Sequence, residues 1–564
     1  MRITNKIMQR NNLSNINTNK MYQNKLSTQM STQKKINRPS EDPVVAIRSL
    51  RLRSNVTEIT QYYSKNIPDA ESWLKVTEDA LSKLSDVISN MAAQCTRGTN
   101  KPFTTTDRGT VLEQLKLLAD EVYATGDADF AGRYVFTGHR TDTPLSFLSE
   151  QERKYTITEQ LDKNALDSFT SVNTGKVLDI NSENYDDPPQ DAITEDDIKS
   201  VDVHRIRLAY NDCVNGKDAS GKDIVPVISF VTGANTDGTI NTKVWADGNP
   251  KTTDNSVTPP FTKYQIKQVN YADDPYSAAA GDADAVIYVP ETGELLFGDN
   301  AYKALMATKD SEATSNVNEG EIRITYEKSH WQKGDLRPEH YFACKADKVD
   351  EAGNVIDTNG NVITDPTKQT AARINYNDTY LTTDKERQVI EYDVGYNQTI
   401  RINSRADECF NHGIGREVDD IINAMQNVLE LEEAQADIKA IKDKLDDGDP
   451  NHAILQKQLD AVEKALTYAK EKEQKMFEGG ISAFQKYLDE ANVCVTACGS
   501  RGSKLDLIKN RSQNQKTTYE TLKSENEDVD ITEVAIQLTS AELTYDAALM
   551  AAGKVMKTTL LDFI

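Results

Sequence analysis

A regular apolar spacing from Leu52 to Met91 constrains the fold of this chain more than any other feature. Mostly apolar side chains recur there at alternating steps of four and three residues: Leu52, Val56, Ile59, Tyr63, Asn66, Ala70, Trp73, Thr77, Ala80, Leu84, Val87 and Met91. This spacing is an a/d seam, which lies along one side of a helix and has to be buried against another helix. At about 1.5 Å per residue the helix would be roughly 60 Å long. A parallel apolar row widens the stripe and predicts more than one partner helix: Ile67, Leu74, Leu81 and Ile88.

Sequence signals predict where this helix begins and where it is disturbed. In the segment from Arg38 to Pro43, either Ser40 or Asp42 can cap the helix, and Pro43 suits its first turn. Pro68 removes one backbone N–H within the helix, and its ring clashes with the preceding turn. Because the apolar spacing keeps its phase across Pro68, we expect a kink there and not a stop.

The two ends of the chain carry opposite charge and complementary seams. Residues 1–40 contain eight Lys or Arg and no acid, whereas residues 526–564 contain seven acids and two lysines. The C-terminal seam consists of Val534, Leu538, Ala541, Tyr545, Ala548, Ala552 and Val555. The N-terminal face is thin and includes Ile3, Ile7 and Leu13. We interpret both as assembly surfaces, and we expect residues 1–37 to be disordered in the monomer because they bury too little apolar area alone.

The middle of the chain differs from its ends. From about residue 149 to 410, short alternating apolar runs are separated by Gly, Asn, Asp and Pro turns, which predicts β-strands. The fold class is therefore α+β, with a long helical coiled-coil or bundle rod built from both terminal segments and a β-rich inserted outer domain. We expect three parts: terminal coiled-coil segments (1–40 with 526–564), a helical rod (41–148 with 411–525) and a β-rich variable domain (149–410).

Composition excludes several classes of partner. The chain has 564 residues and a net charge of −24, which argues against nucleic acid. No apolar run is long enough to span a membrane, and the basic N-terminus lacks the continuous apolar stretch of a cleavable secretion signal. A mitochondrial transit peptide is the alternative for such a start, although Asn, Gln and Lys outweigh Arg there. The six scattered cysteines show no framework spacing, so we expect free thiols.

No motif for catalysis, cofactor binding or metal binding is found. The sequence lacks a zinc-protease His-Glu-x-x-His, a P-loop, a Gly-x-Ser-x-Gly elbow and a dinucleotide-binding glycine pattern. Cys494 and Cys498 lie one helical turn apart, but a pair of buried small side chains is the simpler reading. The Asp- and Asn-rich segment 350–365 lacks the spacing of an EF-hand and is interpreted as turns. We expect no enzyme activity, no cofactor and no metal.

Both ends of the sequence resemble the flagellin superfamily. The segments that carry the resemblance are Arg38-Pro-Ser-Glu-Asp-Pro-Val-Val-Ala, Ala70-Glu-Ser-Trp-Leu through Val87, and the tail from Ile531 to Ile564. Three further segments resemble the branch of that superfamily found at the hook–filament junction: Met1-Arg-Ile-Thr, Gly132 to Pro144, and Ala551 to Ile564. The resemblance covers roughly residues 1–148 and 411–564, together with the closing strands of the insert between Tyr392 and Phe410.

The resemblance implies an exported structural subunit of the bacterial flagellum. Such proteins pass unfolded through a type III export channel without a cleavable signal, and their terminal segments pair inside a tube. The implied partners are identical subunits in a ring, the first hook-associated protein, flagellin, and an export chaperone on the C-terminal segment. The alternatives are the filament subunit itself, an enzyme carried on the filament, and a cytosolic coiled-coil scaffold.

Overall fold

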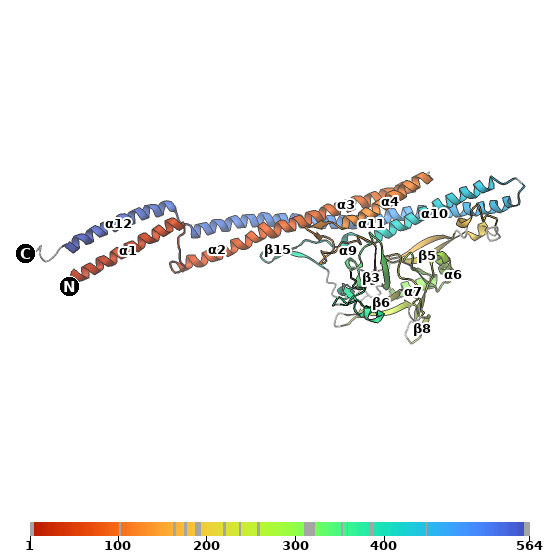
Figure 1. Ribbon diagram of the computed structural model, residues 1–564, viewed down its shortest axis with the longest axis horizontal. Helices are drawn as coiled ribbons and strands as arrows, with labels where there is room; N and C mark the ends of the chain where they lie inside the picture. Colours follow the sequence, from red (N-terminus) through yellow and green to blue (C-terminus); the bar gives the residue numbers. More distant parts are fainter. Residues whose placement is uncertain are drawn as a thin grey trace, which may run out of the picture. The chain divides into compact units, whose positions relative to one another are not determined.

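The computed structural model describes residues 5–100, 103–161, 165–173, 177–186, 193–217, 221–235, 239–256, 260–309, 322–350, 354–357, 359–382, 388–446 and 448–557. Helices form both ends of the chain and strands dominate its middle (Figure 1), which confirms the predicted α+β class. The chain divides into two compact units: Met1–Ser72 with Glu391–Arg401 and Arg501–Ile564, and Trp73–Ile390 with Ile402–Ser500.

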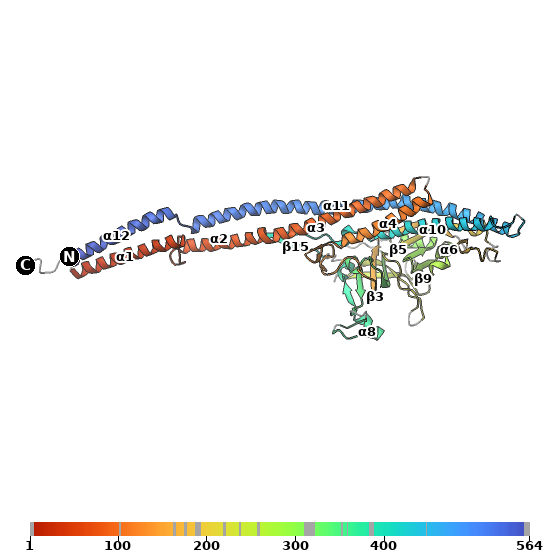
Figure 2. The same ribbon diagram turned by 45° about the horizontal axis from the view of Figure 1, so that its top comes forward.

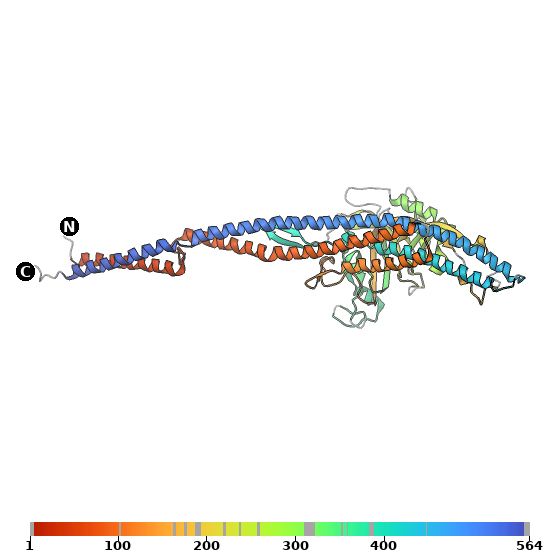
Figure 3. The ribbon, with the colours of Figure 1, turned by 90° about the horizontal axis from the view of Figure 1, so that it is seen from above.

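The first unit contains two pairs of adjacent helices. Its helical elements are α1 (Asn5–Thr32), α2 (Pro43–Gln61), the π-helical turn η1 (Tyr62–Asn66), the start of α3 (Ile67–Thr99), the end of α11 (Asn451–Glu527) and α12 (Ile531–Lys557). Helix α1 lies beside α12, and α2 lies beside the last part of α11; Figures 2 and 3 show both pairs from two directions. The predicted cap of α2 is Asp42, whose Oδ1 accepts the N–H groups of Val44 and Val45 at 3.0 and 3.1 Å.

The helix continues across Pro68, as the phase of the apolar spacing predicted. The turn just before it is π-helical, and the N–H of Ile67 bonds the carbonyl of Tyr62, five residues back. A π-turn widens the helix locally, which makes room for a proline ring that would clash in a regular α-turn. The helix is thus locally disturbed at Pro68 without ending there, and the disturbance takes the form of a π-turn.

A β-hairpin from the C-terminal end of the insert packs on this π-turn. Strands β15 (Glu391–Gly395) and β16 (Gln398–Arg401) pair antiparallel. The amide of Asn66 donates to the carbonyl of Asp393 at 2.8 Å, and the hydroxyl of Tyr392 donates to Asp69. The hairpin thus belongs to the first unit although the chain reaches it from the second.

The helices of the second unit bury the rest of the predicted seam. They comprise the remainder of α3 and α11 together with α4 (Thr105–Gly126) and α10 (Gly413–Lys442). Trp73, Leu84 and Met91 are almost fully buried, whereas Leu52, Val56, Ile59 and Tyr63 of the first unit are half-buried. The second row is buried as well: Ile67, Leu74, Leu81 and Ile88. Both predicted stripes therefore face the protein interior.

Twelve strands of the second unit form one large, mixed sheet. Its order is β14-β13-β3-β12-β6-β7-β9-β10-β11-β5-β4, with β8 paired to β9. The strands are β3 (Gln151–Leu161), β4 (Leu166–Asn173), β5 (Lys199–Arg207), β6 (Val227–Ala234), β7 (Ile240–Asp247), β8 (Thr252–Asp254), β9 (Phe261–Gln268), β10 (Val286–Val289), β11 (Glu294–Phe297), β12 (Ile322–Trp331), β13 (Ala343–Ala346) and β14 (Ile374–Tyr376). Most neighbours are antiparallel, but β9 runs parallel to both β7 and β10.

Two apolar clusters connect this sheet and the adjoining loops to the helices. One gathers Val177, Ile180, Ile193 and Ile198 against α10 and α11. The other lies where β4, β5, β10 and β11 meet α6 (Pro275–Gly281), and it includes Phe169, Tyr276 and Leu296. The segment from Gly132 to Pro144, which carries part of the resemblance, contains β2 (Arg133–Tyr134), which pairs with β1 (Asp129–Phe130). The Asp- and Asn-rich segment 350–365, interpreted above as turns, lies partly outside the described residues.

Candidate assembly surface on the terminal helices

The predicted C-terminal seam lies against α1. Val534 and Ala541 are buried and form a cluster with Leu26 of α1, onto which Leu538 packs. Three further members of the seam are half-buried: Tyr545, Ala548 and Ala552. Val555 continues the same spacing within α12, but its side chain lies outside the described residues. The described members of the predicted seam thus share one covered face of α12.

The face that α1 turns toward α12 is thin and mostly polar. Besides Leu26, it consists of half-buried residues at four- and three-residue steps: Asn12, Ile16, Asn19 and Gln23. The predicted residues Ile7 and Leu13 do not lie on it, because they are 50% and 59% exposed. Ile3 lies outside the described residues. The sequence correctly indicated a weak N-terminal face, but not which side chains meet α12.

A second apolar seam runs along the opposite side of α12, and our reading of the sequence missed it. Ile536, Leu543 and Met550 recur every seven residues and are 68%, 70% and 70% exposed. Ser540 and Ala547 fill the intervening positions, which completes a second alternation of four and three. These positions are two residues on from the covered seam, or about 200° around the helix. We call Ile536, Ser540, Leu543, Ala547 and Met550 the outer seam.

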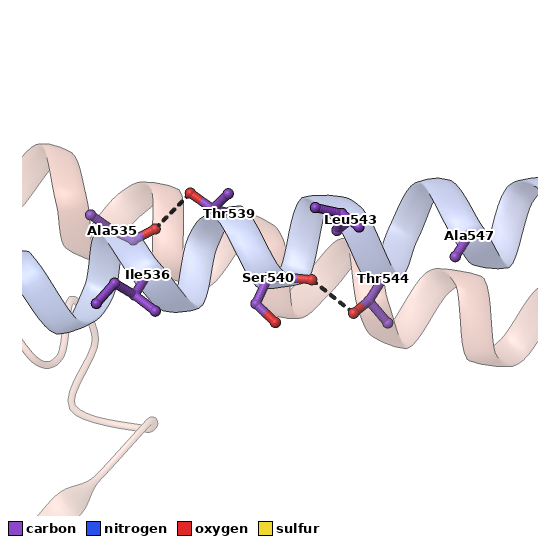
Figure 4. Close-up of a pocket in the computed structure, with 7 residues that line it drawn as sticks. All are labelled: Ala535, Ile536, Thr539, Ser540, Leu543, Thr544 and Ala547. Atoms are coloured by element: carbon purple, nitrogen blue, oxygen red, sulfur yellow. Dashed lines mark hydrogen bonds between the residues drawn. The ribbon is translucent and has the colours of Figure 1, made fainter.

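An open groove of about 800 Å³ follows the outer seam. Figure 4 shows its lining residues: Ala535, Ile536, Thr539, Ser540, Leu543, Thr544 and Ala547. The hydroxyls of Thr539 and Thr544 donate to the carbonyls of Ala535 and Ser540 at 2.9 and 2.8 Å, within the same helix. Because these threonine hydroxyls bond their own helix, the groove presents a largely apolar surface to any neighbour.

A buried carboxylate ties together the ends of the helices in the first unit. Glu527, at the end of α11, accepts two hydrogen bonds from Arg53 of α2 at 2.6 and 2.8 Å and one from Ser49. Lys34, just after α1, lies 3.5 Å from the same carboxylate. The side chain of Glu527 is only 4% exposed. The hydrogen bonds from Arg53, followed by that from Ser49, lower the pKa of Glu527 to about 2.

Backbone contacts reinforce this junction. The N–H of Lys35 bonds the carbonyl of Glu527 at 2.8 Å, and the N–H of Val529 bonds the carbonyl of Gln33 at 3.1 Å. The two connecting segments, from α1 to α2 and from α11 to α12, are therefore fastened to each other. This arrangement sets where the α1–α12 pair begins.

The described residues offer no obvious chemical centre. Within them, no group of three or more His, Cys, Asp or Glu side chains could hold a metal ion, and no helix is long and apolar enough to cross a membrane. All six cysteines are free thiols, as predicted, and five are buried. Burial raises the pKa of Cys95 and of Cys213 to about 12, which suppresses their reactivity.

Comparisons with known proteins agree with the resemblance at the N-terminal end of the chain. Residues 3–141 match the bacterial flagellin N-terminal helical region. Flagellar hook-associated protein 3 of Escherichia coli strain K12 is 26% identical over 198 residues, which are 35% of this chain and 61% of that protein. Its namesake from Salmonella typhimurium strain LT2 is 27% identical over 143 residues, 25% of this chain and 45% of that protein. A flagellin from Clostridium tyrobutyricum is 28% identical over 122 residues, 22% of this chain and 32% of that protein.

The chain can also be aligned with solved structures of flagellar proteins. A flagellar hook-associated protein from Vibrio parahaemolyticus shares 12% identity with a TM-score of 0.30, covering 86% of this chain and 100% of that one. The flagellar junction protein FlgL from Legionella pneumophila shares 9% identity with a TM-score of 0.25 over 86% and 100% of the two chains.

The helical ends and the sequence matches make the chain similar to proteins of the flagellin superfamily. Within that superfamily the chain is similar to flagellar hook-associated protein 3, of which the matched regions span 61% and 45% of the two relatives' lengths.

Proposed function

We propose that this chain is a structural subunit of the bacterial flagellum that joins the hook-associated ring to the flagellin filament. The relatives at 26% and 27% identity are both named flagellar hook-associated protein 3, which supports a place beside the hook. The role is structural and not enzymatic, and the chain reaches its place outside the cell by type III export.

The outer seam of α12 is the observation that carries the proposal. A helix with apolar seams on two opposite sides needs two neighbours, and within the described residues of the first unit only α1 covers one of them. Fully burying a Leu, Ile or Met side chain contributes about 1.5 to 3 kcal/mol. A second chain that covers Ile536, Leu543 and Met550 would therefore gain several kcal/mol of binding energy.

The remaining partners that we propose are those that the resemblance implies. Identical subunits form a ring, the first hook-associated protein lies on one side of it, and flagellin assembles on the other. The terminal segments 1–40 and 526–564 line the inner tube, residues 41–148 with 411–525 form a coiled-coil rod, and residues 149–410 form the outer domain. Before assembly, an export chaperone covers the C-terminal segment, since an exposed apolar seam would otherwise aggregate.

Two charge-adding variants test the proposal. Leu543→Asp places a carboxylate on the outer seam, where burial in an interface would cost several kcal/mol in each copy. We expect an unchanged melting temperature and, from the protein that is secreted, no filaments. Leu538→Asp places a charge on the covered seam. We expect it to separate α1 from α12, to leave the melting temperature of the second unit unchanged and to abolish filaments. Gly553→Asp adds the same charge at an exposed position about 100° around the helix from both seams and serves as the matched control.

The outcomes are separable. Normal filaments from Leu543→Asp cells would show that the outer seam is not an assembly surface. Immunogold labelling of intact flagella then tests the location, and we expect label only where the hook meets the filament. Label along the whole filament would contradict the junction role.

The filament subunit is the second candidate, because the 28% match to a flagellin favours it. Copy number separates the two: a junction subunit is a minor band in purified filaments, and a filament subunit is the dominant one.

A further inference from the structure

Helix α2 has an exposed apolar surface that no described element of the first unit covers. Val44, Ile47 and Leu50 recur every three residues along one ridge of the helix and are 66%, 57% and 65% exposed. This ridge lies on a different side of α2 from the buried Ser49, which bonds α11. We call Val44, Ile47 and Leu50 the α2 ridge. Adjoining exposed apolar side chains of this kind indicate an interaction surface.

Two arginines border the α2 ridge. Arg48 lies one helical turn after Val44, Arg51 lies one turn after Ile47, and both arginines are exposed. Within the described part of the chain neither of them pairs with a carboxylate, whereas Arg53 on the following turn pairs with α11. The α2 ridge is therefore an apolar surface with an unmatched positive edge.

An open groove of about 570 Å³ extends this surface toward α11. Its lining includes three apolar and three charged side chains: Val45, Leu52, Leu522, Lys35, Arg48 and Glu525. Arg48 belongs to both the groove and the edge of the ridge. Since two of the three charged groups are cations, the groove favours the same partner as the ridge, an apolar helix with an acidic edge.

The outer seam of α12 has the complementary character. On its flank lies Asp546, three residues after Leu543 and four before Met550. Glu542 lies one turn before Asp546, and both carboxylates are exposed and without a cationic partner among the described residues. Residues 542–550 extend about 12 Å along α12, and residues 44–51 extend about 10 Å along α2. The two surfaces thus match in length as well as in charge.

Charge selects α12 over α1 as the partner of the α2 ridge. Helix α1 also exposes apolar side chains, among them Leu13 and Met21 at 59% and 71%. Its sequence contains no acid and four basic residues: Lys6, Arg10, Lys20 and Lys25. Placing α1 on the α2 ridge would bring like charges together, which disfavours that pairing.

We propose that the α2 ridge of one copy binds the outer seam of α12 in a neighbouring copy, a contact that rests on the ring of identical subunits proposed above. Ile47 and Leu50 pack against Leu543 and Met550 of the neighbour. At the edge, one arginine of α2 pairs with Asp546. Because two different surfaces meet, the contact is heterologous, so a pair of copies keeps one free surface of each kind and association continues beyond the dimer.

Mixing two single-cysteine variants of the full-length chain tests the contact. Ile47→Cys and Leu543→Cys are oxidised with copper phenanthroline, separately and together, and the products are separated on a non-reducing gel. We expect a cross-linked dimer only in the mixture, since a heterologous contact places position 47 beside position 543. Leu507→Cys, at a 72% exposed leucine of α11 off both surfaces, replaces Ile47→Cys in the matched control. The natural chain controls for its own six cysteines.

Charge reversal supplies a second measurement in the same mixture. Arg51→Glu in the Ile47→Cys chain should slow cross-linking about tenfold, and so should Asp546→Arg in the Leu543→Cys chain. The two reversals together should restore the rate, because they exchange the signs of one pair. Asp506→Arg reverses an exposed charge on α11 away from both surfaces and should leave the rate unchanged.

Each outcome decides for or against the contact. Cross-linking that appears only in the mixture, falls with either reversal and returns with both supports it. Dimers from Leu543→Cys alone would show that outer seams pair with each other, and a mixture of folded variants without the 47–543 product would overturn the proposal. Rates that ignore both reversals would overturn it as well. These results come from solution, so they are separate from the immunogold test: label along the whole filament would refute the junction role and not this contact.

Discussion

Replacing Glu527 by Gln should loosen the junction at which α1, α2, α11 and α12 meet. The substitution keeps the size of the side chain but removes the negative charge that Arg53, Ser49 and Lys34 surround. The pKa of Glu527 falls from 4.5 to about 2 in the folded chain, and each pKa unit corresponds to about 1.4 kcal/mol. The charge therefore contributes up to about 3 kcal/mol. Because Arg53 is itself 53% exposed and screened by solvent, we expect a loss of about 2 kcal/mol.

The sign of the pH dependence follows from the depressed pKa. The contribution is complete above the unfolded-state value of about 4.5 and disappears as pH falls toward about 2. Amide hydrogen exchange at Lys35 and Val529 reports on the junction directly, because their N–H groups bond across it. At neutral pH, Glu527→Gln should accelerate exchange at both amides about 30-fold, after correction for the intrinsic rate. Near pH 2.5 the variant and the natural chain should converge.

Glu525→Gln is the control, since it removes a charge from an exposed neighbour on the same helix. Equal exchange at Val529 in the Glu525 and Glu527 variants would refute the assignment of stability to the buried carboxylate. A difference that persists unchanged at pH 2.5 would refute its electrostatic origin.

Three further predictions concern other parts of the chain. Arg205→Ala leaves buried carboxylates unpaired and should destabilise the second unit by about 3 to 5 kcal/mol in urea titration, whereas Lys199→Ala on the same strand should change little. Glu159→Gln should raise the free energy of unfolding at pH 8 but not at pH 4. Burial raises the pKa of Glu159 to about 7, so ionisation of the folded chain at pH 8 costs up to about 3 kcal/mol. An equal gain at both pH values would contradict this. In the isolated monomer, amides of residues 5–32 should exchange faster than those of α3, because α1 meets α12 through a thin and mostly polar face; equal protection of the two helices would contradict this.

The helical parts of this fold were accessible from sequence because their signal is local. The step of four and three from Leu52 to Met91 survives every turn of α2 and α3, and the same alternation marks the covered face of α12. The outer seam escaped notice because Ser540 and Ala547 are small and weakly apolar. The sequence did not show which α1 side chains meet α12, because Ile7 and Leu13 are apolar yet exposed, while Asn12 and Gln23 are polar yet covered.

The sheet was less accessible, since strand order depends on contacts between distant residues. Strand β3 begins with charged residues and buries Glu159, so its pattern does not read as a clean apolar alternation. Strand β5 buries Arg205, whose charge is compensated by Asp420 some two hundred positions later.

The hydrogen bonds between the two connecting segments have a mechanical consequence. Within the first unit, two chain segments join the α1–α12 pair to α2 and α11. They leave the pair next to each other, at Thr32 and at Ile531. A force along the axis of the α1–α12 pair is carried by both connecting segments, and a torque on one segment is passed to the other. The two connected segments therefore resist rotation of the α1–α12 pair about its long axis, whereas a single flexible linker would allow that rotation.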